Sequence, residues 1–178
     1  TEVHAAGSVT GQNTVGGLVG QVYGGTITQA YATGAVTGQN LVGGLAGNNY
    51  GTITASFFDT QTTGQANGIG GGITVGYRAE VTGLTTAQAR LSSSYTGWDF
   101  TTDWYQSADM RPIGRWEAAA VVNGVATVSN LHQLALIDTN RSGSYVLAAN
   151  LDASATAGTT AAGIWGTGGF VPIGPNSD

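Results

Sequence analysis

The chain contains no cysteine and no lysine, and charged residues make up only 8% of its 178 residues. Without cysteine it can form neither a disulfide nor a thiolate metal site. Because the net charge is −5 and the five arginines form no run, the composition predicts no binding to nucleic acid or anionic membranes. No apolar run approaches the roughly 18 residues of a membrane-spanning helix, so we expect no direct membrane insertion.

Glycine, in contrast, is abundant, with 30 residues in the chain. So much glycine is typical of disordered segments, of collagen or of closely stacked turns. A hydrophobic content of 41% argues against disorder, and no Gly-x-y triplet period is present. Closely stacked turns are therefore the interpretation that the composition favours.

A stretch of 16 residues occurs twice. Residues 5–20 read AAGSVTGQNTVGGLVG and residues 32–47 read ATGAVTGQNLVGGLAG, which match at 12 of 16 positions with a shift of 27. The GTIT segments at 25–28 and 51–54 repeat with a shift of 26, so one turn residue near Gly24 or Gly25 has been dropped. A glycine-rich period in this range predicts a stacked-coil solenoid.

Short β-branched runs between turn residues predict short strands rather than helices. Stacked coils would place parallel strands about 4.8 Å apart, with each apolar side chain above its counterpart. The predicted interior positions are Val9, Val15, Leu18, Val19, Ile27, Val36, Val42, Leu45 and Ile53.

Two further features of the repeat predict its corners. Gly16-Gly17 and Gly43-Gly44 would supply either positive φ or close backbone approach. Gln12-Asn13 and Gln39-Asn40 would stack as ladders of side-chain amides.

The pattern VGGLVG, GTIT, TGQN, VGGLAG resembles the GLUG repeat of large secreted bacterial adhesins of the filamentous-haemagglutinin, two-partner-secretion kind. Residues 56–64 and 83–88 resemble the segment that closes a run of such repeats, and residues 131–174 the segment that opens a new block. The resemblance implies a right-handed parallel β-helix, a β-solenoid, with an extracellular, non-catalytic role. Its signature residues here are Gly16, Gly17, Leu18, Gly20, Gly43, Gly44, Leu45 and Gly47.

Three segments are expected: solenoid coils over 1–83, an aromatic-rich connector or cap over 84–116, and the start of a second β-rich module over 117–178. Thr85 and Gln88 form a capping-box pattern that predicts a short helix over 86–92. In the last segment, Asn123-Gly124 predicts a hairpin over 121–128. Asn130 predicts the start of a helix that runs to Ile137, and residues 144–148 predict a strand.

The connector concentrates large aromatic side chains, which we expect to pack as a lid over one flank of the solenoid. They are Tyr95, Trp98, Phe100, Trp104, Tyr105 and Trp116. The alternative is a sugar-binding platform, with Trp98, Trp104 and Trp116 as the glycan contacts.

No catalytic pattern stands out. His4 and His132 show no metal-ligand spacing, and Gly71-x4-Gly76 is followed by tyrosine instead of the lysine of a phosphate-binding loop. His132 is expected to be a surface or packing residue. Asp99, Asp103 and Asp109 are predicted as turn and cap residues, with Ca²⁺ ligation as the alternative. The sequence therefore predicts no enzyme, no cofactor and no metal.

Together these features favour a stiff spacer and surface contact in a secreted or cell-surface bacterial adhesin or filament. Its expected partners are other copies or adjacent repeat modules stacked end to end, and host or matrix glycans or proteins. The alternatives are a carbohydrate-binding or polysaccharide-processing β-helix module, or an ice-binding solenoid with a threonine array. That array would consist of Thr26, Thr28, Thr52 and Thr54.

Overall fold

The computed structural model describes residues 2–72, 78–157 and 161–174. Its contacts divide the chain into two compact units. The N-terminal unit comprises residues 1–98 with 161–163, and the C-terminal unit comprises 99–160 with 164–178. The division follows Trp98 and so lies inside the connector predicted over 84–116.

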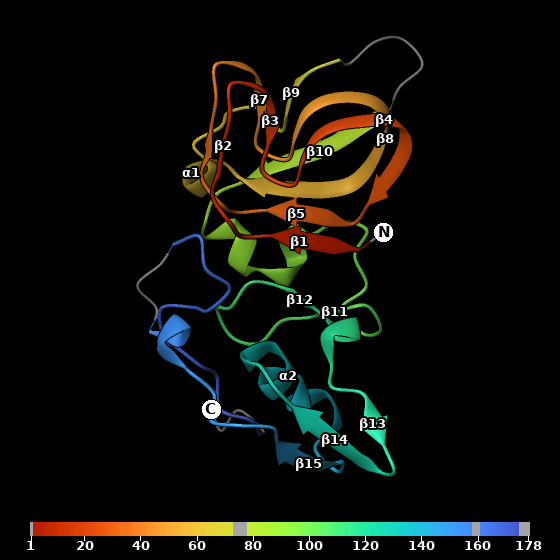
Figure 1. The fold of residues 1–178 in the computed structure, drawn as a ribbon, viewed down its shortest axis with the longest axis vertical. Helices are drawn as coiled ribbons and strands as arrows, with labels where there is room; N and C mark the ends of the chain where they lie inside the picture. Colours follow the sequence, from red (N-terminus) through yellow and green to blue (C-terminus); the bar gives the residue numbers. More distant parts are fainter. Residues whose placement is uncertain (1, 73–77, 158–160, 175–178) are drawn as a thin grey trace. The chain divides into compact units, whose positions relative to one another are not determined.

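The N-terminal unit consists mostly of strands (Figure 1). They are β1 (Val3–Ala5), β2 (Val9–Thr10), β3 (Asn13–Gly16), β4 (Val19–Thr28), β5 (Ala30–Ala32), β6 (Val36–Thr37), β7 (Asn40–Gly43), β8 (Ala46–Asp59), β9 (Ile69–Gly71) and β10 (Arg78–Leu84). Helix α1 (Thr60–Thr63) and two 3-10 turns, η1 (Gln88–Arg90) and η2 (Ser92–Ser94), complete it.

The two copies of the repeat pair with each other in parallel. Val9 pairs with Val36, and Val15 with Val42. Strands β1, β5 and β8 lie side by side, and β4 and β10 also pair with β8 (Figure 1). The fold is therefore a set of small stacked parallel sheets and is solenoid-like. The closed, right-handed β-helix that the resemblance implies stays a prediction.

The register changes where the sequence predicts a dropped turn residue. Tyr23 pairs with Tyr50 at a separation of 27, whereas Thr26 pairs with Thr52 at a separation of 26. Gly24, with φ of 69°, lies in this irregularity and adopts a left-handed conformation that glycine tolerates best. The extra residue is thus absorbed as a bulge, and the following strands stay in register.

The core of this unit lies between the stacked sheets, where valine, isoleucine and leucine contribute as predicted. Its fully buried members also include alanines and a phenylalanine, which the apolar pattern alone did not single out. The cluster is Val22, Ala30, Ala32, Leu45, Ala46, Ile53 and Phe58, with Val3, Leu18, Val19, Ile27, Ile69 and Val81 packed against it.

The paired glycines provide close approach, and the alternative of positive φ is wrong for them. A Cβ on Gly17 would lie 2.9 Å from the Cβ of Ala32, and one on Gly43 would lie 2.6 Å from the backbone nitrogen of Gly70. Positive φ instead occurs at non-glycine residues one coil apart: Thr14 and Leu41, and Gln29 and Ala55. The corner geometry therefore repeats even where the side chains differ.

Two of the six connector aromatics pack in the N-terminal unit as predicted. Tyr95 lies edge-on to Phe57 with ring centroids 5.0 Å apart, and Trp98 lies 5.8 Å from Tyr31. The other four belong to the C-terminal unit. Thr85 and Gln88 form the predicted capping box, but the turn that follows is a 3-10 helix rather than an α-helix.

Within its described residues, the C-terminal unit combines short strands with one α-helix. Its elements are β11 (Trp104–Tyr105), β12 (Ile113–Gly114), η3 (Arg115–Glu117), β13 (Val121–Val122), β14 (Val125–Val128), α2 (Leu131–Leu136), η4 (Ile137–Asn140), β15 (Ser144–Leu147) and η5 (Ser154–Thr156). The β13–β14 hairpin is confirmed, with positive φ at both Asn123 and Gly124. Strands β14 and β15 are parallel and are joined through α2 (Figure 1). None of the helices in the described ranges is both long and apolar enough to span a membrane.

Candidate functional site

The three tryptophans predicted as glycan contacts differ in exposure. Trp98 is 9% exposed and donates its indole N–H to the Ala55 carbonyl at 2.7 Å. Trp104 is fully buried, and its ring lies edge-on to that of Trp116 at 4.8 Å. Trp116 is 47% exposed. Of the three, only Trp116 therefore presents a broad ring surface to solvent.

The acidic side chains of the connector mainly hold turns. Asp99 accepts backbone hydrogen bonds from Thr101 at 2.6 Å and Thr102 at 3.2 Å, and the Thr101 bond is the largest of the causes that lower the Asp99 pKa to about 2. Asp109 accepts hydrogen bonds from the backbone and hydroxyl of Thr167. Turn stabilisation is thus confirmed for Asp99, while Ca²⁺ ligation stays an untested alternative.

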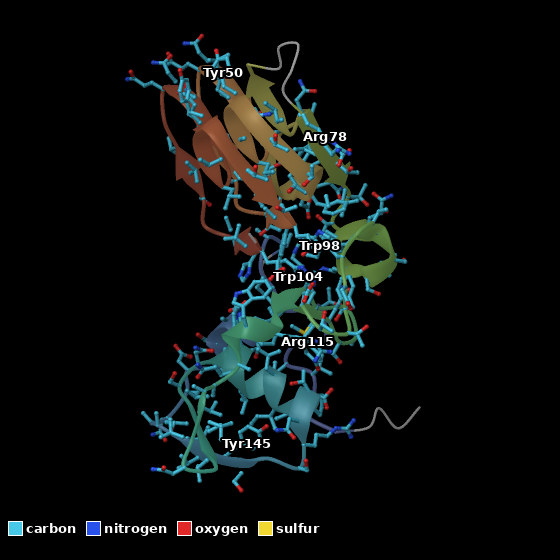
Figure 2. The ribbon with its side chains drawn as sticks, turned by 90° about the vertical axis from the view of Figure 1, so that its right-hand side faces the viewer. Tyr50, Arg78, Trp98, Trp104, Arg115 and Tyr145 are labelled. Atoms are coloured by element: carbon cyan, nitrogen blue, oxygen red, sulfur yellow. The ribbon has the colours of Figure 1, made fainter. Side chains whose placement is uncertain are left out.

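The outer surface of the N-terminal unit carries the threonine array predicted as an ice-binding alternative. Thr26 pairs with Thr52, and Thr28 pairs with Thr54. In the next strand, however, Arg78 pairs with Thr52, and its guanidinium bonds to Glu80. The array therefore ends after two coils at a charged strand, β10, on which Arg78 is marked in Figure 2.

The side-chain amides of the repeat form a ladder between the two coils. The Asn40 amide donates to the Asn13 side-chain oxygen at 2.8 Å, and the two residues are paired in β3 and β7. The amide ladder is thus confirmed for the asparagines.

The two open edges of the stacked sheets differ in chemistry. Among the described residues, each strand of the first coil, β1 to β4, pairs with one strand only, which belongs to the following coil. We call this row of four strands the first edge. Residues 3–58 contain no Asp, Glu, Lys or Arg, so this first edge is uncharged. At the opposite end, β10 carries the Arg78–Glu80 pair, and the Gln65 amide donates to the Val36 carbonyl at 2.9 Å. Charged edge strands oppose pairing with further strands, so the first edge is the less protected one.

The described part of the C-terminal unit contains a pocket of about 510 Å³. It is lined by Ser129, Asn130, Leu131, His132, Asn150, Leu151, Asp152, Ala155 and Trp165. Asn130 caps α2 through a hydrogen bond from the Gln133 backbone, so the cap places the start of the helix at the pocket wall.

Two side chains of the pocket are held by their neighbours. His132 Nδ1 lies 2.5 Å from Glu117 Oε2, and the imidazole lies edge-on to Trp165 at 6.0 Å. Trp165 is 5% exposed, and its ring centroid lies 5.3 Å from that of Phe170. The sequence predicts a surface or packing role for His132, and its contacts with Trp165 and Glu117 agree with packing. Trp165 was missed because no motif links it to the distant residues beside it.

At the rim, Asp152 accepts a hydrogen bond from the Ser154 backbone at 2.9 Å. This bond is the main cause that lowers the Asp152 pKa, so the side chain is ionised at neutral pH. No lysine or arginine lines the described pocket. The site is thus an apolar floor with a polar, negatively charged rim.

Comparison with known proteins gives one family match: residues 11–37 match the GLUG motif. The matched segment covers all of β3, β4, β5 and β6, and it includes the signature residues of the first copy. No curated protein and no solved structure matches the chain.

Proposed function

We propose that this chain is a non-catalytic structural segment of an extracellular adhesin or surface filament, secreted or held at the bacterial cell surface. It acts as a stiff spacer whose stacked coils continue into adjacent repeat modules. The observation that carries this proposal is the parallel pairing of the two copies, with Val9 on Val36 and Val15 on Val42.

Parallel stacking makes a unit extendable, because each strand leaves a row of backbone donors and acceptors for the next. The first edge, formed by β1 to β4, has such a row and lacks charged residues. The β10 edge bears the Arg78–Glu80 pair, which opposes extension there. We infer that adjacent modules, or further copies, stack on the first edge.

Light scattering across a concentration series tests the stacking. The wild-type chain should associate as its concentration rises, whereas Thr10→Lys, which places a charge on exposed β2, should weaken the association. Thr82→Lys on exposed β10 is the matched control and should behave like the wild type. A strictly monomeric wild-type protein at high concentration would count against the proposal.

The carbohydrate-binding alternative retains one supporting observation, the C-terminal pocket with its aromatic floor. A polysaccharide-processing enzyme would need a pair of carboxylates that flank the bond to be cleaved, and the coil segment 3–58 contains no carboxylate. An ice-binding surface is disfavoured because Arg78 replaces threonine in the third row. An activity screen on polysaccharides and a thermal-hysteresis assay would test these two alternatives.

A further inference from the structure

We propose that the pocket formed by His132, Asp152 and Trp165 in the C-terminal unit binds a neutral saccharide unit. This inference goes beyond stacking and does not depend on it, because all residues of the pocket lie in the C-terminal unit.

The size and lining of the pocket suit a ligand of that kind. Its volume of about 510 Å³ lies within the range of small-molecule sites, roughly 300–1,000 Å³. Leu131, Leu151 and Trp165 supply an apolar wall, and Asn150 and Asp152 supply exposed polar groups. A pyranose ring likewise combines an apolar face of C–H groups with a polar periphery of hydroxyls.

The aromatic floor is preorganised. Trp165 contacts the rings of His132, at 6.0 Å, and Phe170, at 5.3 Å, so it does not have to be ordered when a ligand binds. Because Trp165 is 5% exposed, it offers a ligand only a small part of its ring, and Leu131 and Leu151 supply the rest of the apolar surface. His132 is itself oriented by the Glu117 carboxylate at 2.5 Å. Amphipathic aromatic side chains held in this way provide both an apolar surface and a polar group that can form a hydrogen bond.

The charge of the pocket selects against anions. Ionised Asp152 accepts hydrogen bonds through two oxygens, which suits adjacent hydroxyl donors. The same charge repels carboxylates and phosphates, and no arginine of the described lining offsets it. Asn150 offers both a donor and an acceptor beside it. A neutral, polyhydroxylated ligand is therefore favoured over an anionic one.

The test is a protein-observed NMR titration of the full chain with glucose, galactose, mannose and N-acetylglucosamine, with glucuronate as the anionic counterpart. At least one neutral sugar should shift the backbone signals of residues 129–132 and 150–155 and the indole signal of Trp165. Glucuronate should bind more weakly than glucose.

Asp152→Asn should weaken binding of that sugar about tenfold, because it removes a charge-assisted acceptor. Asparagine keeps an oxygen that can accept from Ser154, so the turn should stay folded, as the NMR spectrum will show. Asp99→Asn is the matched control, since Asp99 forms the same kind of turn outside the pocket and should leave affinity unchanged.

Three results would overturn the proposal: no sugar of the panel perturbs the pocket, Asp152→Asn binds as tightly as the wild type, or glucuronate binds more tightly than glucose. None of these outcomes bears on the light-scattering test of stacking.

Discussion

At the scale of single residues, glycine is needed chiefly where coils crowd one another. A Cβ on Gly44 would overlap the Phe58 ring, with ring atom Cε2 only 2.7 Å away, and a Cβ on Gly47 would lie 2.5 Å from the Val15 backbone nitrogen. Real Cβ atoms do not approach neighbours this closely, so either residue or its neighbour would have to move. The repeated glycines therefore mark points of contact between successive coils.

Gly44→Ala should lower the free energy of unfolding by about 1–3 kcal/mol, because the methyl group would overlap the buried Phe58 ring. Denaturant unfolding measures the loss. Gly7→Ala is the matched control, since nothing lies within 4 Å of a Cβ there, and it should change stability by less than about 0.5 kcal/mol. Equal stability of the two variants would show that Gly44 is not crowded.

Residue types alone did not reveal where the backbone adopts positive φ. The doubled glycines predicted tight corners, yet positive φ falls on Thr14 and Leu41, residue types that give no signal for it. The stacked environment imposes that conformation, and a single-residue preference cannot reveal it.

At the scale of elements, the segment that ends the second coil depends on one buried carboxylate. Asp59, 1% exposed, accepts from the backbones of Gln61 at 2.9 Å and Thr62 at 3.1 Å, which caps α1. Its second oxygen accepts from the Thr86 hydroxyl at 2.9 Å. This carboxylate thus joins the end of β8 to the segment after β10.

Asp59→Ala should cost about 2–3 kcal/mol of stability, since it removes a helix cap and leaves partly buried donors without their acceptor. Hydrogen exchange should speed up in α1 and in residues 84–90. Asp99→Ala removes a similar but exposed cap and should cost less. A loss for Asp59→Ala no greater than that for Asp99→Ala would refute the joining role.

Elements governed by local chemistry were predictable. The Asn123-Gly124 turn and the Asn130 cap follow from backbone and side-chain preferences of neighbouring residues. The pocket was not predictable, because its residues His132, Asp152 and Trp165 come from three separate segments. Glu117, which contacts His132 from outside the lining, comes from a fourth. Only the folded C-terminal unit brings them together.

At the scale of the whole molecule, the sequence predicts the stacking in the first segment but not the boundary between the two units. The repeat predicted parallel stacking of the first segment because identical sequences share one core when they lie in register. The division after Trp98 carries no such signal, and the run of aromatics from Tyr95 to Trp116 conceals it. The proposed spacer function depends on the parallel stacking of the two copies, which can be tested without determining another structure.

The absence of cysteine allows the register to be measured by disulfide formation. Thr10 and Thr37 are exposed partners in β2 and β6, about 4.8 Å apart as neighbours in a parallel sheet, within reach of a disulfide. Under mild oxidation, the double variant Thr10→Cys/Thr37→Cys should form an intramolecular disulfide detectable by mass spectrometry, whereas Thr10→Cys/Asn40→Cys, which is out of register, should not. Failure of the first pair, or equal cross-linking of both, would contradict the parallel stacking of the two copies.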